Sequence, residues 1–259
     1  MKKVTIAILL SVVLVFSAFG IASAITNGEL DGDGHPHVGL LVFDVGGFPA
    51  WRCSGTLLSP TILLTAGHCT FGADDGRVWF ESDVQNDVVG YPFDTATSVA
   101  FCGIHTHPDY DDAAFFLHDV GVVELCEPVY VDTYGTLPSA NQLDALKPRK
   151  QNWFTAVGYG LQRINPVFVE AERVRMVATP HLVQINVPGF TGDFSLLLSN
   201  NHSTGGTCFG DSGGPNFLGD SNVVAGVTSF GINGNCAGTG GVFRMDRQNV
   251  LDFVNQFLD

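Results

Sequence analysis

The stretch with the clearest chemical potential surrounds Ser212, in the Gly-Asp-Ser-Gly-Gly-Pro sequence of residues 210–215. A serine hydroxyl attacks a carbonyl carbon only when a base accepts its proton and backbone N–H groups stabilise the oxyanion. Flanking glycines suit the sharp turn that such a serine needs and let a substrate backbone approach. The stretch therefore indicates a nucleophile. Its G-x-S-x-G core is also typical of α/β-hydrolases.

The order of residues along the chain separates these alternatives. In α/β-hydrolases the catalytic histidine follows the serine. Here the last histidine is His202, which precedes Ser212. The base must therefore come from upstream, and His68 in the Leu-Thr-Ala-Gly-His-Cys segment 64–69 is the candidate.

A histidine that acts as a base is usually oriented by a third group, often a carboxylate. Asp119 opens the Asp-Val-Gly-Val-Val-Glu-Leu segment 119–125, whose apolar run predicts a buried strand. Asp111 and Asp112 are nearby rivals, but no apolar strand follows either of them. The apolar strand that follows Asp119 therefore distinguishes it from these two rivals.

Together these segments resemble the chymotrypsin/trypsin-like serine peptidase family. Segment 65–69 is similar to the family's T-A-A-H-C, segment 158–160 to its G-W-G and segment 229–231 to its S-W-G, with a different aromatic residue in the last two. The resemblance implies a catalytic triad of His68, Asp119 and Ser212, with an oxyanion hole formed by the N–H groups of Gly210 and Ser212. It implies a secreted serine endopeptidase that works through an acyl-enzyme without a cofactor.

The same resemblance implies the position of the pocket that binds the residue before the scissile bond. Its base corresponds to Gly206 and its walls include the residues Thr207, Ser229, Gly231 and Gly241. Since no charged side chain stands at the base, a buried Arg or Lys of the substrate would lack a partner. The expected preference is for large apolar residues.

The chain has six cysteines, an even number that predicts three disulfides in an exported protein. The resemblance implies two bridges, Cys53–Cys69 beside the histidine and Cys208–Cys236 beside the pocket. Cys102 and Cys126 then remain, and we expect them to form a third bridge that is not standard for the family. Because no C-x-x-C pair occurs, the cysteines do not indicate a zinc site.

Residues 1–24 have the pattern of a signal peptide, with two lysines, an apolar run over 4–19 and Ala-Ser-Ala at 22–24. About 16 apolar residues are few for a membrane-spanning helix. Cleavage after residue 24 would free Ile25, which the resemblance pairs with Asp211 in an ion pair. Cleavage after Gly20 is the rival and would leave residues 21–24 as a short propeptide. The mature protein is expected to be secreted, to the extracellular space or periplasm.

Short apolar runs separated by turn residues, with 31 glycines and 15% charged residues in 259, favour an all-β protein. We expect strands at 38–43, 55–58, 62–66, 120–125, 154–157, 172–178, 223–229 and 241–245. The resemblance implies two six-stranded antiparallel β-barrels with the active site between them. Their expected bounds are about 25–137 and 138–245, within a peptidase domain of 25–259, with residues 138–151 as a linker. Helical spacing over 246–259 predicts a short C-terminal helix with Asp246 as its N-cap.

Other features are assigned no role in the chemistry. The net charge of −14 disfavours nucleic acid as a partner. The expected substrates are proteins or peptides, and the protein is expected to be a monomer. The histidines and acids of 105–118 are interpreted as non-metal residues, and His35 and His37 as solvated. Two functional alternatives stay open: an inactive relative that binds a partner, and an exported esterase with the same triad.

Overall fold

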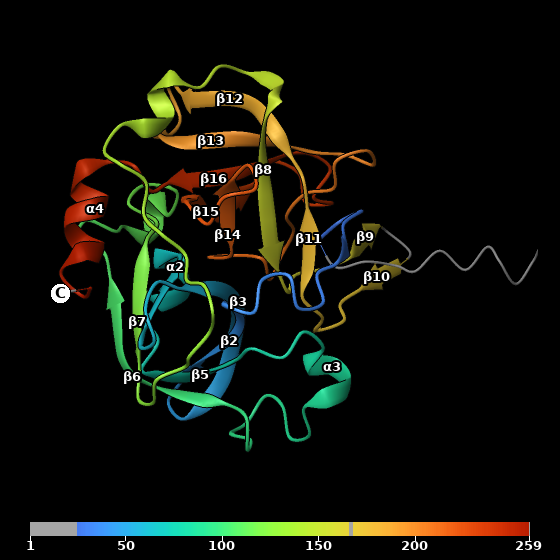
Figure 1. The fold of residues 1–259 in the computed structure, drawn as a ribbon, viewed down its shortest axis with the longest axis vertical. Helices are drawn as coiled ribbons and strands as arrows, with labels where there is room; N and C mark the ends of the chain where they lie inside the picture. Colours follow the sequence, from blue (N-terminus) through green and yellow to red (C-terminus); the bar gives the residue numbers. More distant parts are fainter. Residues whose placement is uncertain (1–24, 166–167, 259) are drawn as a thin grey trace, which may run out of the picture.

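A computed structural model describes residues 25–165 and 168–258 (Figure 1). The predicted signal peptide lies outside the described residues. The first barrel is a closed antiparallel sheet in the order β2-β3-β4-β7-β6-β5. Its strands are β2 (Val38–Val45), β3 (Phe48–Leu57), β4 (Ile62–Thr65), β5 (Asp75–Trp79), β6 (Val99–Thr106) and β7 (Gly121–Leu125).

The second barrel closes because the last strand of its sheet, β14, pairs back with β8. Its six strands are β8 (Arg149–Gly158), β12 (His181–Val187), β13 (Gly192–Asn200), β16 (Gly238–Arg244), β15 (Val224–Gly231) and β14 (Pro215–Leu218). Two further strands, β11 (Met176–Ala178) and β1 (Glu29–Leu30), extend the sheet from the edge of β8. A separate hairpin consists of β9 (Arg163–Asn165) and β10 (Phe168–Glu170). The expected pair of six-stranded antiparallel barrels is confirmed.

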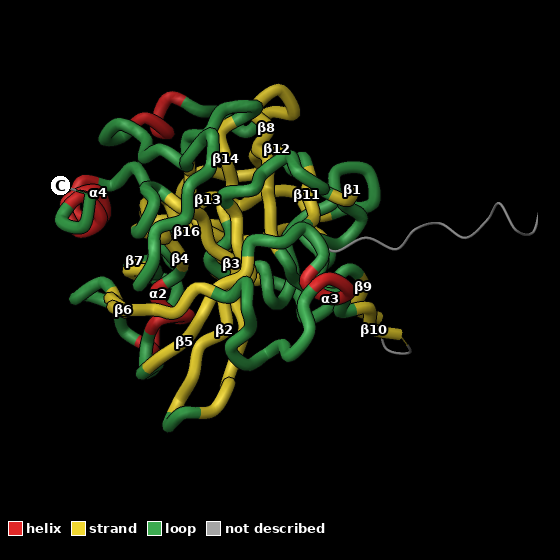
Figure 2. Tube along the Cα trace, turned by 60° about the horizontal axis from the view of Figure 1, so that its bottom comes forward, coloured by secondary structure: helices red, strands yellow, loops and turns green. Residues whose placement is uncertain are grey.

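In residues 25–165 and 168–258 the helices are few and short. They are α2 (Gly67–Thr70), α3 (Val84–Asp87), α4 (Gln248–Asn255) and the 3-10 turns Asp112–Ala114 and Gln142–Ala145. The α4 helix lies at the C-terminal end of the described chain, as Figures 1 and 2 show. Within the described residues, no helix has both the length and the apolar character needed to span a bilayer.

The predicted N-cap of α4 is wrong. The cap position is Arg247, and its side chain makes no capping hydrogen bond. Asp246 is instead buried, where it accepts hydrogen bonds from Arg244 and from the backbone N–H of Leu143. A buried guanidinium needs a carboxylate partner, and this requirement takes Asp246 away from the helix.

Several strand predictions also differ from the structure. Segment 172–178 is a strand only from residue 176, and the predicted linker 138–151 contains a 3-10 turn and the start of β8. β6 was missed because a bulge between Phe101 and Gly103 interrupts the alternation of inward and outward residues. β12 has two such irregularities.

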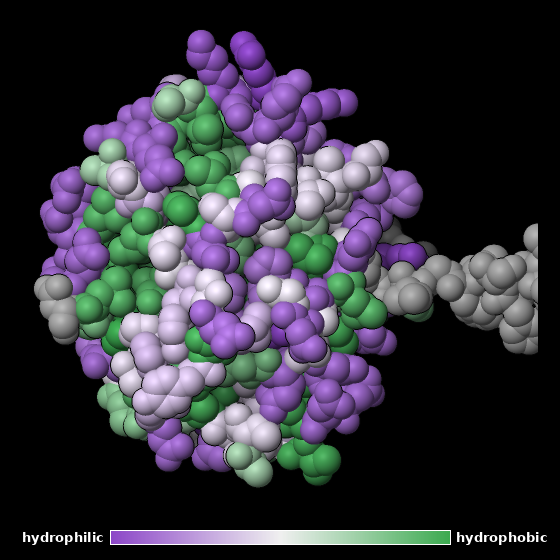
Figure 3. Space-filling view, viewed as in Figure 1, coloured by the Kyte–Doolittle hydropathy of each residue, from purple (hydrophilic) through white to green (hydrophobic). Residues whose placement is uncertain are grey.

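One large hydrophobic core joins the two barrels. It includes Leu41, Trp79 and Val123 of the first barrel and Phe217 and Phe243 of the second. On the face drawn in Figure 3, hydrophobic residues are interspersed with hydrophilic ones. The shared core holds the barrels against each other, so side chains from both can meet at one site.

Candidate active site

Two paired strands bring His68 and Asp119 together. β4 and β7 are antiparallel with Thr65 opposite Gly121, so the chain segments that leave β4 and enter β7 are neighbours. His68 follows β4 in the helix α2, and Asp119 precedes β7. The Nδ1 atom of His68 lies 2.9 Å from Oδ2 and 3.1 Å from Oδ1 of Asp119. The backbone N–H of His68 donates to Oδ1 at 2.8 Å.

Asp119 is fully buried and has a further donor from the second barrel. The hydroxyl of Ser229 donates to Oδ2 at 2.5 Å. Burial alone would lower the pKa of His68, but the charge and hydrogen bond of Asp119 outweigh it, and the pKa is raised. The carboxylate thus fixes the imidazole with a proton on Nδ1, which leaves Nε2 as the basic nitrogen.

Ser212 and His68 line the same cavity, which has a volume of about 270 Å³. Among the hydrogen bonds of the described residues, none joins the Ser212 hydroxyl to the imidazole. Such bonds are often long in a free enzyme and tighten when substrate binds. The backbone takes a positive φ at Gly210 (96°) and Gly213 (77°), a conformation that favours glycine on both sides of the serine.

Asp211, next to the serine, is fully buried. Its carboxylate accepts backbone N–H groups of Gly160 at 2.7 Å and Cys208 at 2.8 Å. Burial raises the pKa of Asp211 to about 7, against the opposing effects of those two bonds and of the positive charge of Arg52. This carboxylate therefore lies in a site that favours a cationic partner.

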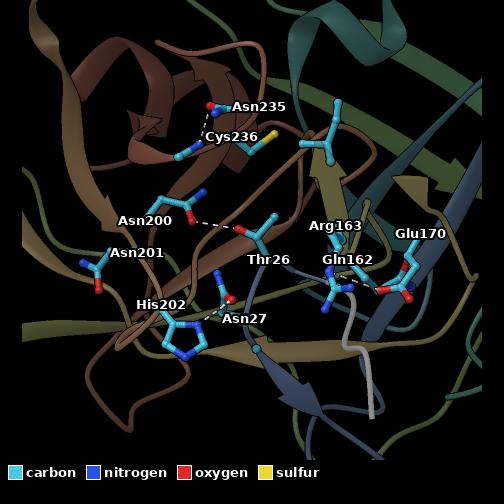
Figure 4. A pocket seen from close by; sticks show the side chains of 13 residues that line it. Thr26, Asn27, Gln162, Arg163, Glu170, Asn200, Asn201, His202, Asn235 and Cys236 are labelled. Atoms are coloured by element: carbon cyan, nitrogen blue, oxygen red, sulfur yellow. Dashed lines mark hydrogen bonds and ion pairs between the residues drawn. The ribbon is translucent and has the colours of Figure 1, made fainter. Parts of the chain in front are cut away.

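The segment that follows Ile25 is docked on the second barrel. Ile25 is fully buried, and Thr26 forms an antiparallel bridge with Gly206. The Thr26 hydroxyl donates to Oδ1 of Asn200 at 2.7 Å, and Nδ2 of Asn200 donates to the carbonyl of Thr207 at 2.8 Å. Figure 4 shows Thr26 directed at Asn200 on one wall of a polar pocket of about 510 Å³.

The predicted ion pair between Ile25 and Asp211 is not among the contacts of the described residues. The hydrogen bonds of Asp211 go to the backbone of Gly160 and Cys208 instead. The pairing of Ile25 with Asp211 stays a prediction about a chain that begins at Ile25.

The predicted specificity pocket is only partly assembled as expected. Thr207, Ser229 and Gly231 line the cavity beside Ser212. Gly206 and Gly241 are not among its lining residues. A Cβ atom on Gly206 would overlap the side chain of Asn200, and one on Gly241 would overlap the ring of Phe230. The side chains of Asn200 and Phe230 therefore occupy the space beside these two glycines.

Three aromatic residues contribute walls of the cavity: Phe115 and Phe209, which the sequence reasoning missed, and Phe230, which it noted only as the aromatic residue of segment 229–231. The Phe115 ring meets the His68 ring edge to face, with centroids 6.0 Å apart. Phe209 lies three residues before the nucleophile, and this closeness in the sequence could have indicated that it lines the cavity. His68 is the only ionisable side chain in the lining.

All three disulfides are present, as Cys53–Cys69, Cys102–Cys126 and Cys208–Cys236. Cys69 adjoins the histidine, and both members of the third bridge line the cavity. The second bridge ties β6 to the residue that follows β7. Cys53–Cys69 and Cys208–Cys236 therefore lie beside the site, while Cys102–Cys126 joins β6 to the end of β7 that is remote from Asp119.

Two histidines that could ligate a metal each use one ring nitrogen in a hydrogen bond within the protein. His107, Asp109 and His118 have potential ligand atoms within 4.8 Å of one another. However, Nδ1 of His107 accepts the backbone N–H of Asp109 at 3.1 Å, and Nδ1 of His118 bonds the Asn249 amide at 3.2 Å. These histidines thus hold the loop before Asp119 against α4.

The prediction that His35 and His37 are solvated is wrong. His35 is paired with Asp31, and His37 is only 2% exposed. Asp31 also binds the buried Arg175, which pulls residues 31–37 into the interface with the second barrel. The Asp31 carboxylate is therefore engaged by two side chains of the protein, His35 and Arg175.

The fold and this site together define the class of protein. A buried aspartate orients a histidine toward a serine loop, in a cavity with walls from two six-stranded barrels. These are the features of a serine endopeptidase.

Comparisons with known proteins agree. Residues 32–254 match the family model described as Trypsin. The chain is 31% identical to brachyurin of Leptuca pugilator over 211 residues, which cover 78% of this chain and 83% of that protein. It is 26% identical to a collagenase of Hypoderma lineatum over 206 residues, 79% of this chain and 75% of that protein. The solved structure of HL collagenase, at 23% identity, covers 90% of this chain and 98% of its own with a TM-score of 0.71, which supports the fold. The chain belongs to the trypsin family.

Proposed function

We propose that this trypsin-family protein is a secreted endopeptidase that cleaves proteins through an acyl-enzyme, with His68, Asp119 and Ser212 as its triad. The observation that carries the proposal is the 2.9 Å contact between His68 Nδ1 and the buried Asp119. The imidazole ring of the same His68 lines one cavity together with Ser212. The three disulfides and the signal-peptide pattern of residues 1–24 support export.

The chemistry follows from these positions. The Ser212 hydroxyl attacks the peptide carbonyl while His68 Nε2 accepts its proton, and Asp119 stabilises the imidazolium that forms. The backbone N–H groups of Gly210 and Ser212 hold the oxyanion. His68 then protonates the leaving amine, and a water molecule, activated by the same nitrogen, hydrolyses the acyl-enzyme.

The proposed cleavage preference is for large apolar residues before the scissile bond. Phe115, Phe209 and Phe230 give the cavity apolar walls, and no carboxylate lines it to pair with Arg or Lys. A library of peptides that differ only at this position measures the preference. Faster cleavage after Arg than after Phe or Leu would refute it.

The proposed activation step is removal of the signal peptide itself. Cleavage after residue 24 would create an ammonium group on Ile25, close to where Thr26 already docks on Gly206. Asp211, with its pKa raised by burial, would gain the cationic partner that its site favours. N-terminal sequencing of the active secreted protein tests this step, and a start at residue 21 would contradict it.

The triad itself is tested by Ser212→Ala. The variant is expected to keep its fold, because alanine is smaller than serine, and to lose nearly all hydrolysis of casein and peptide substrates. A panel of esters and peptides separates the alternatives: an esterase would leave peptides intact, and an inactive binding protein would cleave neither. Substantial turnover of casein or peptides by the Ser212→Ala variant would overturn the assignment.

A further inference from the structure

We infer that Ser54 is a positioning residue of the oxyanion loop, because its hydroxyl and its backbone N–H together fix residues 210–212. The inference rests on the proposed function, since it concerns the geometry of the same site. Ser54 lies on β3 in the first barrel, fully buried, and 156 positions before Gly210.

Two hydrogen bonds run from Ser54 to the loop. Its backbone N–H donates to the carbonyl of Ser212 at 2.8 Å. Its hydroxyl donates to the carbonyl of Gly210 at 3.0 Å. One residue of the first barrel therefore holds the carbonyls on both sides of Asp211.

The direction of the hydroxyl is fixed by a third contact. The Ser54 oxygen accepts the backbone N–H of Tyr159 at 3.0 Å. A hydroxyl has a single proton to donate. Because its oxygen receives the Tyr159 N–H, that proton is available for Gly210. Tyr159 precedes Gly160, whose N–H binds Asp211, so the second barrel supports the same loop from the other side.

These contacts determine which way the loop presents its donors. The carbonyl of Asp211 accepts the Gly214 N–H at 2.8 Å, so the carbonyls of Gly210, Asp211 and Ser212 are all bound within the protein. Among the described residues, no hydrogen bond involves the N–H groups of Gly210 or Ser212. They are left as the pair that a substrate oxyanion can meet.

Gly210 is the member of this pair that most needs support. Its positive φ of 96° is a conformation that glycine adopts freely, so the residue has little intrinsic preference for one orientation. In the described part of the chain, Ser54 Oγ is the sole hydrogen-bond donor to its carbonyl. Loss of this hydroxyl would free the carbonyl of Gly210 to rotate, and the adjoining N–H would lose its aim.

The test is Ser54→Ala, which keeps the backbone N–H and removes the hydroxyl. Since outright loss of an oxyanion donor lowers kcat by roughly 100- to 1,000-fold, loosening one donor is expected to lower kcat by roughly 10- to 100-fold. KM should change little, because Ser54 is not among the residues that line the cavity. Ser54→Gly, which also lacks the hydroxyl, is a second variant in case the first does not fold.

Thr56→Val is the matched control. Thr56 lies two positions along β3, on the same face, and is equally buried. Its hydroxyl bonds the carbonyl of His37 at 3.5 Å and does not contact the loop. This variant should resemble Ser54→Ala in its loss of a buried hydroxyl and still retain wild-type kcat.

A peptide trifluoromethyl ketone provides a readout that general destabilisation would not move. Ser212 adds to this probe to form a hemiketal whose oxygen occupies the oxyanion hole. In Ser54→Ala we expect weaker binding of the probe and a higher hemiketal pKa by carbon-13 NMR, in proportion to the loss of kcat.

Wild-type kcat and hemiketal pKa in folded Ser54→Ala or Ser54→Gly would overturn the Ser54 proposal alone. The proposal would also be overturned if Ser54→Ala and Thr56→Val lowered kcat to the same extent and the hemiketal pKa of Ser54→Ala kept its wild-type value. A wild-type protein without peptidase activity would overturn the proposed function as well.

Discussion

Replacement of Ser229 by alanine perturbs the triad without touching a reacting atom. The Ser229 hydroxyl donates to Asp119 Oδ2 at 2.5 Å, and the carboxylate keeps its bonds to the side chain and backbone of His68. A hydrogen bond to a charged group contributes about 1.5–3 kcal/mol. We therefore expect the variant to unfold about 2 kcal/mol more easily, a fall in Tm of roughly 4–8 °C for a chain of this length.

The same substitution should change the pH dependence of activity. In the wild type, Asp119 raises the pKa of His68 against the effect of burial. Without the Ser229 donor the carboxylate is less well compensated and attracts the imidazolium more strongly. The pKa of His68 should rise further, so the acid limb of kcat/KM against pH should move to higher pH. At the pH optimum we expect kcat/KM of the variant to fall about tenfold, which corresponds to about 1.4 kcal/mol of lost transition-state stabilisation.

Thermal unfolding and pH–rate profiles of the variant and the wild type measure both effects. Ser199→Ala is the control, because Ser199 is also buried and hydrogen-bonded but contacts His181 and Thr204 away from the site. It should lower Tm without moving the acid limb. An acid limb that stays in place in Ser229→Ala, or that moves to lower pH, would refute the reasoning.

Three further outcomes follow from the structure. Gly213→Ala should destabilise the fold by roughly 2–5 kcal/mol in chemical denaturation, because the new methyl would overlap the Thr65 hydroxyl at a positive φ; wild-type stability would contradict this. His37 has its pKa lowered to about 4, chiefly by burial, so the unfolded chain binds a proton more readily and stability should fall as the pH drops from 6.5 toward 4. His37→Leu should flatten that slope in urea titrations, and an unchanged slope would exclude His37 as its source. A secreted chain with one extra alanine before Ile25 should lose activity, since an uncompensated Asp211 costs about 3–5 kcal/mol; full kcat/KM would rule out the ion pair.

The sequence by itself determined the family and the general fold. The segments around His68, Asp119 and Ser212 are short and local, and their chemical demands constrain neighbouring residues. Turn spacing indicated an all-β protein, and the family resemblance carried by these motifs implied the two barrels, even where strand boundaries were missed. Some of the strands that were missed, such as β6 and β12, carry bulges that interrupt the two-residue period on which such predictions depend.

Only the tertiary structure decided which side chains support and surround the site. The bond from Ser54 to Gly210 spans 156 residues, and that from Ser229 to Asp119 spans 110. The overlap of Asn200 with the space beside Gly206 likewise depends on how β13 lies against the loop before the nucleophile. Contacts of this kind leave no periodic pattern in the sequence, because they arise where separate strands meet after the two barrels have packed on a shared core.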